Sequence, residues 1–154
     1  MAVRICAEDF DLGREVALLR AGNHAIGAIA SFVGTVRDIN SVAGDALAVQ
    51  GMELEHYPGM TERALEEIIA LARARWRVID ALIIHRIGAL QPGDQIVLVA
   101  VASGHRGDAF LACEFIMDYL KTRAPFWKKE FTAGGARWVE GREEDEQAAA
   151  RWQP

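Results

Sequence analysis

The chain has 154 residues, a length that suits one domain, spanning residues 1–154, around a single core. Hydrophobic residues make up 51% and charged residues 25%, which is the usual balance of a globular protein. The sequence contains no run of about 18 apolar residues, so no membrane span is predicted. The formal net charge of -5 argues against a general nucleic-acid binder. We therefore expect no nucleic-acid or membrane partner. We also expect a cytoplasmic location, because the first residues lack the apolar stretch of a secretory signal.

The two cysteines, Cys6 and Cys113, are isolated from each other and do not form a CxxC pair. This pattern indicates neither a zinc site nor a disulfide framework, and we expect no metal. Cys113 falls in an apolar helical stretch, where a buried and inert thiol is expected. A cysteine nucleophile is therefore disfavoured.

The first third of the chain predicts a strand at residues 2–6, a helix at 12–20 and a buried strand at 25–34, which is rich in small and β-branched residues. The polar segment at residues 35–46 is predicted to be a mobile loop. A second strand follows at residues 46–56, and a break in its alternation near Gly51 suggests a bulge.

Pro58 and Gly59 then turn the chain into an amphipathic helix. Two strands are expected at residues 78–87 and 95–102, joined through the turn sequence LQPGDQ. The apolar stripe of the helix, which we expect to face the core, consists of Leu65, Ile68, Ile69, Ala72 and Trp76.

A second long helix is predicted at residues 107–123, and Pro125 ends it because proline disfavours helical geometry in the preceding residue. A hairpin at residues 126–131 and 137–140 and a tail helix within 142–154 complete the chain. The apolar stripe of the long helix is predicted to consist of Phe110, Cys113, Met117 and Leu120. Consecutive strands without intervening helices indicate antiparallel pairing, so the predicted class is α+β.

The motif SGHRGDAF is the first candidate site, because it follows a hydrophobic strand and opens a helix. Backbone N–H groups at a helix start, together with Arg106, could bind a phosphate or carboxylate. The alternative is that His105 and Arg106 only cap and solvate a glycine turn, which is a common feature. Arg37 is a second candidate, since it emerges from a buried strand into a polar loop, although a loop arginine is often plain surface.

The segment MDYLKTRAPFWKKE places Lys121 in the last turn of a helix and Lys128 on a strand after Pro125. Both ammonium groups could face one cavity, with Phe126 and Trp127 as its apolar walls. Neighbouring cations and desolvation both favour a neutral, reactive amine. The alternative is that one lysine complements the helix dipole and the other solvates a strand edge.

The motifs LEHYPGMTERAL, IIHRIGALQPGD, SGHRGDAF and MDYLKTRAPFWKKE occur in this order, and the chain resembles the catalytic large subunit of molybdopterin synthase over residues 25–152. The resemblance implies an α/β hammerhead-type fold with a mostly antiparallel sheet and two long helices. It also implies a sulfurtransferase that makes the molybdopterin dithiolene from cyclic pyranopterin monophosphate (precursor Z). The implied partners are a small ubiquitin-like sulfur-carrier subunit with a C-terminal Gly-Gly thiocarboxylate and a second copy of the chain, a homodimer within a heterotetramer. No cofactor is implied.

The resemblance also assigns site residues, position by position. Lys121 and Lys128 match the family's active-site lysines. His105 and Arg106 match its substrate-binding pair, and Arg37 matches the arginine of its first substrate loop. Arg37, His105 and Arg106 would hold a cyclic phosphate through charge-assisted hydrogen bonds.

Four further positions are assigned to substrate binding by the same resemblance: Lys129 and Glu130 in the lysine motif, and Thr35 and Val36 before Arg37. Thr35 stands where relatives can carry a lysine, so Arg37 is expected to be the anion contact of this loop.

Two other classes of function are compatible with the residues. The first is a non-catalytic module that binds a pterin phosphate or a ubiquitin-like protein. The second is an acyl or phosphoryl transferase with His105 as general base. The second would need a nucleophile or a metal ligand set, and the sequence offers neither a convincing Ser-His-Asp order nor HxH spacing.

Overall fold

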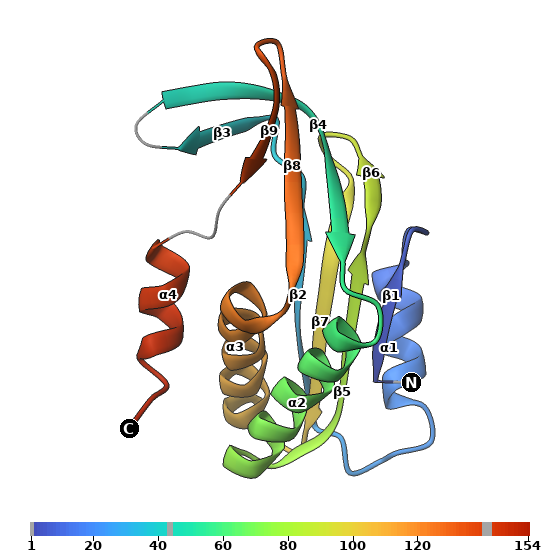
Figure 1. Cartoon of the computed structure of the whole chain (residues 1–154). Coiled ribbons are helices and arrows are strands. Elements are labelled where there is room, and N and C mark those ends of the chain that lie inside the picture. Colours follow the sequence, from blue (N-terminus) through green and yellow to red (C-terminus); the bar gives the residue numbers. More distant parts are fainter. Residues whose placement is uncertain (1, 43–44, 140–142) are drawn as a thin grey trace.

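The computed structural model describes residues 2–42, 45–139 and 143–154, with only the backbone described at 39–42 and 45–47. Its first sheet has the strand order β1-β5-β7-β2 (Figure 1). β1 pairs with β5 in parallel, whereas the other pairs are antiparallel. The strands are β1 (Val3–Cys6), β5 (Val78–Arg86), β7 (Gln95–Ser103) and β2 (Ala28–Thr35).

Helices cover both faces of this sheet: α2 (Met60–Arg75) and α3 (Arg106–Arg123) lie on one side and α1 (Leu12–Arg20) on the other (Figure 1). In β7, Val97, Val99 and Val101 pack into the core beneath α2 and α3. The alternating Leu98 and Ala100 pack with residues of the α1 side. Burial on both faces explains why this strand is apolar without interruption.

The second sheet is antiparallel, with the order β3-β4-β8-β9 and β6 paired to β4. It stands at one end of the first sheet, beyond the start of α2 and the end of α3 (Figure 1). The predicted α+β class, mostly antiparallel pairing and two long helices are confirmed. The strands are β3 (Ile39–Val42), β4 (Asp45–His56), β6 (Gly88–Leu90), β8 (Phe126–Thr132) and β9 (Gly135–Val139).

The predicted loop at residues 35–46 is where the structure differs most from expectation. Its residues Ile39–Val42 form β3, which pairs antiparallel with the start of β4. Backbone pairing with β4 provides strand structure that the polar side chains do not signal. Residues 43–44 of this segment lie outside the described residues, and its mobility stays a prediction. The predicted bulge near Gly51 is confirmed by a register shift between Val49 and Gly51.

The stripe predicted on α2 is confirmed, since its four members within the helix are all buried. On α3 the prediction was wrong for Phe110, whose exposed fraction is 64%. Phe115 is buried instead and packs edge-on against Trp76, with 5.3 Å between ring centroids. In that part of the helix Ala109, Ala112 and Cys113 are the buried residues, and Phe110 lies on the solvent side.

The predicted tail helix is present as α4 (Glu143–Ala150), and it packs beside α3 (Figure 1). Trp152 lies 5.4 Å from the ring of Trp76, and its indole N–H donates to Asp118. Cys113 is buried, and desolvation raises the pKa of its thiol to about 11, as expected for an inert cysteine. No helix in the described part of the chain is long and apolar enough to cross a membrane.

Candidate active site

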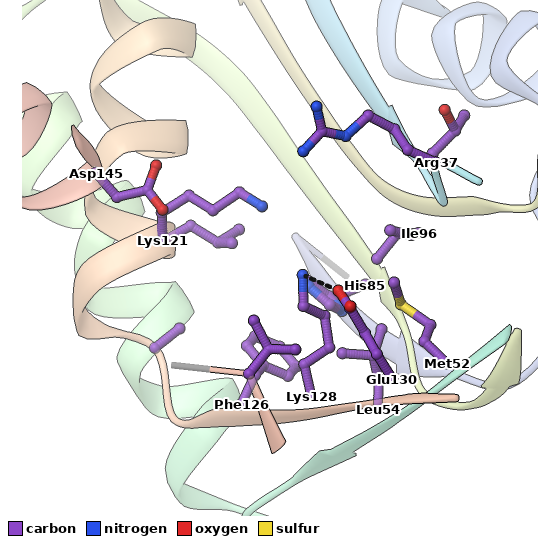
Figure 2. Close-up of a pocket in the computed structure, with 14 residues that line it drawn as sticks. Arg37, Met52, Leu54, His85, Ile96, Lys121, Phe126, Lys128, Glu130 and Asp145 are labelled. Atoms are coloured by element: carbon purple, nitrogen blue, oxygen red, sulfur yellow. Dashed lines mark ion pairs between the residues drawn. The ribbon is translucent and has the colours of Figure 1, made fainter. Parts of the chain in front are cut away.

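A cavity of about 290 Å³ lies where the second sheet meets the C-terminal end of α3. Its walls come from both sheets and from α3 and α4, so residues far apart in sequence converge there (Figure 2). Its volume is close to the lower end of the range for small-molecule sites. The lining residues are Thr35, Arg37, Met52, Leu54, His85, Ile96, Leu120, Lys121, Ala124, Phe126, Lys128, Glu130, Val139 and Asp145.

The alternation of β8 decides which side chains of the lysine motif reach the cavity. Phe126, Lys128 and Glu130 line it. The intervening Trp127 points to the other face of the sheet and is 47% exposed. Lys129 lies on that outer face too, with its Nζ 5.4 Å from the centroid of the Trp138 ring. The expectation that Trp127 forms a cavity wall was therefore wrong.

Lys121 and Arg37 approach the cavity from other directions (Figure 2). Lys121 extends from the last turn of α3, and Arg37 follows the end of β2. Together with Lys128 they bring three cations to one small space. Lysine and arginine only donate hydrogen bonds, so this arrangement suits an anionic ligand. The two lysines face one cavity, as the sequence suggested, and Arg37 joins them there rather than His105 and Arg106.

Glu130 is the buried carboxylate of the site, with an exposed fraction of 1%. Its Oε1 lies 3.6 Å from Nζ of Lys128, and its Oε2 accepts a hydrogen bond of 3.3 Å from Nη2 of Arg137. A buried charge requires such partners because leaving it unpaired is costly. Glu130 therefore holds Lys128 toward the cavity.

Of the remaining predicted residues, Thr35 and Val36 lie at the cavity and His105 and Arg106 lie away from it. Thr35 lines the cavity, and Val36 is buried beside it, where its backbone N–H donates to the carbonyl of Asp94. His105 and Arg106 lie at the N-terminal end of α3 and do not line the cavity of their own chain. They are separated from Lys121 by nearly the whole helix, roughly 20 Å at 1.5 Å per residue.

Among the polar residues that line the cavity, two were not predicted, His85 and Asp145. Asp145 comes from α4, beyond every motif that was singled out (Figure 2). His85 lies within IIHRIGALQPGD, and a histidine ending an apolar strand was a usable signal. Its ring stacks on Phe126 of β8, a contact between elements far apart in the sequence that places it in the site.

The fold and site define an α+β protein with a cation-lined cavity for a small anionic ligand. A model of the MoaE protein family matches residues 5–123. A molybdopterin synthase catalytic subunit from Ralstonia nicotianae is 67% identical over 150 residues, which is 97% of this chain and 83% of that protein. The corresponding Pseudomonas aeruginosa subunit is 58% identical, and the alignment covers 99% of each chain.

Solved structures agree with these relatives. A molybdopterin biosynthesis MoaE protein from Burkholderia ambifaria has a TM-score of 0.82 and 61% identity over 99% of this chain and 98% of that one. A molybdopterin synthase structure from Staphylococcus aureus has a TM-score of 0.81 and 31% identity over 91% of this chain and 98% of that one. The chain belongs to the MoaE family. Its function is that of a molybdopterin synthase catalytic subunit, an enzyme of molybdenum cofactor biosynthesis.

Proposed function

We propose that this chain is a sulfurtransferase that moves two sulfur atoms to cyclic pyranopterin monophosphate and so builds the molybdopterin dithiolene. Each sulfur comes from the C-terminal thiocarboxylate of one small ubiquitin-like subunit, whose C–S bond breaks and which ends as a carboxylate, so two donors are consumed per substrate. The convergence of Arg37, Lys121 and Lys128 on one cavity carries the proposal, together with family membership. A complex of subunits 1 and 2 of a molybdopterin-converting factor from Helicobacter pylori, 19% identical with a TM-score of 0.74, shares the fold and motivates the two-subunit arrangement.

The cations of the cavity have distinct roles in this proposal. Arg37 holds the phosphate, because a guanidinium can pair with two phosphate oxygens at once. Lys121 is the principal catalytic group and acts as general acid/base or by stabilising negative charge while sulfur attacks the substrate. Lys128 assists and orients the carboxyl terminus of the partner. Sulfur arrives on the partner, so the inert Cys113 is compatible with this chemistry.

His105 and Arg106 act in this proposal across a homodimer. Their roughly 20 Å separation from Lys121 along α3 keeps them from the cavity of their own chain. A symmetric dimer can present the same surface of each copy to the other. The His105-Arg106 pair of one copy then contacts the substrate held by the lysines of its partner.

Mixing two inactive variants tests this arrangement. Lys121→Ala and Arg106→Ala proteins are unfolded together, refolded together and assayed. A site shared between copies yields one intact site in each mixed dimer, so turnover recovers to about a quarter of wild type. A site built within one chain leaves every site defective, and absence of any recovery would contradict the shared site.

The direct test of the proposed function combines purified protein, precursor Z and a thiocarboxylated small subunit, and measures molybdopterin. We expect product to form with two sulfurs delivered per substrate. Binding of both components without product would instead identify a non-catalytic binding module. The matched control uses a partner that ends in a carboxylate in place of the thiocarboxylate, and no product should form with it.

We further propose that the reaction needs no metal or bound cofactor. Within the described residues no group of three or more His, Cys, Asp or Glu side chains could hold a metal ion. Turnover that persists after dialysis against a chelator would support this, and turnover that is lost and then restored by a metal would contradict it. A cytoplasmic location stays a prediction from the sequence.

A further inference from the structure

His85 is a buried histidine in the cavity wall that the roles above do not use. It is the penultimate residue of β5, and its exposed fraction is 5%. Its ring stacks on Phe126 of β8, with 3.8 Å between centroids and 18° between ring planes. Because β5 and β8 belong to different sheets, the stack fixes the ring where the two sheets meet.

The hydrogen bond of His85 defines its tautomer. Nδ1 lies 2.8 Å from the carbonyl oxygen of Arg86. A carbonyl oxygen can only accept a hydrogen bond, so Nδ1 carries the hydrogen. In a neutral imidazole Nε2 then has a lone pair and acts as an acceptor.

The surroundings keep this imidazole neutral. Desolvation is the main cause that lowers the pKa of His85 to about 4, and the charges of Lys121 and His56 lower it further. The bond to Arg86 acts in the opposite direction but does not prevail. The other charged groups around the same cavity are Arg37, Lys128, Glu130 and Asp145.

A neutral acceptor is chemically distinct from these neighbours. In their charged forms Arg37, Lys121 and Lys128 only donate hydrogen bonds, which suits the anionic part of a ligand. The carboxylate of Glu130 is engaged by Lys128 and Arg137. The pterin part of the proposed substrate presents N–H donors, and a donor buried in a site needs an acceptor.

We propose that His85 is a specificity-determining residue, whose Nε2 accepts a hydrogen bond from an N–H donor of the bound pterin while the three cations hold its anionic part. This inference rests on the proposed function and adds the recognition of the heterocycle to it. A site that hydrogen-bonds its substrate discriminates strongly against analogues without the matching group, because the buried partner is left unpaired.

Three substitutions distinguish the role of Nε2 as an acceptor from the structural contacts that His85 makes with Arg86 and Phe126. His85→Gln places an amide near the position of Nε2 and so keeps an acceptor there. His85→Asn keeps a group near the position of Nδ1, which can bond to Arg86, but has none at Nε2. His85→Phe keeps the ring stacked on Phe126 and has no polar atom.

Steady-state kinetics with precursor Z and thiocarboxylated partner, together with the Tm of each variant, test the inference. We expect KM for precursor Z to rise about tenfold in His85→Asn and His85→Phe, the effect of one lost hydrogen bond, and to stay within about threefold in His85→Gln. KM for the partner should not change. A residue with a purely structural role is not expected to change the KM for precursor Z alone.

Three results would overturn the inference. The first is a wild-type KM for precursor Z in His85→Phe. The second is wild-type behaviour of His85→Asn with impairment of His85→Gln, which would show that only the bond to Arg86 matters. The third is an equal loss in all three variants with a lowered Tm. In each case the wild type remains active and the proposed function stands, whereas a wild type without turnover overturns both.

Discussion

Arg137 and Glu130 face each other across the β8–β9 ladder, and Nη2 of the arginine lies 3.3 Å from Oε2 of the glutamate. The second carboxylate oxygen of Glu130 lies 3.6 Å from Nζ of Lys128 (Figure 2). One buried carboxylate thus engages two cations, one from its own strand and one from the neighbouring strand. We infer that the orientation of Lys128 depends on Glu130, whose charge Arg137 also stabilises.

Glu130→Gln tests this dependence, because it keeps the shape of the side chain and removes its charge. We expect turnover to fall about tenfold as Lys128 loses its anchor. The free energy of unfolding should fall by about 1–2 kcal/mol, a modest loss because both cations are about one-third exposed. Glu55→Gln, at an exposed position of β4, is the matched control. Unchanged turnover in Glu130→Gln would show that Lys128 is positioned by other contacts.

Lys128 and Lys129 are adjacent residues on opposite faces of β8, and this provides a matched pair of alanine variants. Lys128→Ala should lower turnover about 10- to 100-fold, since a donor at the reacting charge is lost. The turnover of Lys129→Ala should stay within about twofold of wild type, because this lysine lies on the outer face and provides no donor at the reacting charge. Equal losses in the two variants, measured as molybdopterin formed per unit time, would refute the assignment by strand face.

Lys121→Ala should have the largest effect among the cavity lysines, a fall in turnover of about 100-fold or more. Lys121 extends from a helix whose buried face does not depend on it, so the Tm should stay close to that of wild type. The measurement pairs turnover with thermal unfolding. A folded Lys121→Ala protein with full turnover would remove Lys121 from the mechanism.

The pKa of His85 predicts how stability depends on pH. The pKa lies at about 4 in the folded chain, against 6.5 for an ordinary histidine, so the unfolded chain binds a proton first as the pH falls. Stability is therefore lost on acidification from pH 6.5 toward pH 4, and this group adds no dependence above that window. Between pH 7 and 5 the loss is on the order of 2 kcal/mol.

Denaturant unfolding of wild type and His85→Phe at pH 7 and pH 5 measures the contribution of His85 to the pH dependence of stability. The difference between the two proteins cancels the contribution of shared carboxylates. We expect the wild type to lose more stability than His85→Phe over this interval. The same loss in both proteins would show that His85 does not remain neutral on folding.

Gly27 allows a packing prediction at the start of β2. An added Cβ would lie 2.2 Å from the backbone carbonyl oxygen of Gly104, and the Gly27 N–H donates to Ser103. Backbone cannot move aside as a flexible side chain can, so Gly27→Ala should cost about 1–3 kcal/mol of stability. Gly107→Ala, where an added Cβ meets nothing within 4 Å, is the control and should be neutral or slightly stabilising. A neutral Gly27→Ala would contradict the close approach.

Local sequence patterns were enough to predict most of the secondary structure and the chemical type of the site. Apolar alternation, the turn at Pro92 and Gly93, and Pro125 after the long helix are local signals, so the elements they mark lie close to their predicted positions. The motif containing Lys121 and Lys128 indicated an anionic ligand, because a lysine side chain ordinarily carries a positive charge in any fold. The alternation of β8 would also have separated Lys128 from Lys129.

Which of these residues meet depends on how distant elements pack together. β3 exists because β4 supplies hydrogen-bond partners, and Phe110 is exposed because α3 buries the neighbouring Ala109 and Ala112 in the core instead. Arg37 joins the lysines, and Arg106 does not, because α3 separates its two ends by its full length. His85 becomes part of the site through its stack on Phe126, 41 positions further along the chain. These contacts depend on the packing of distant elements, which no local pattern encodes.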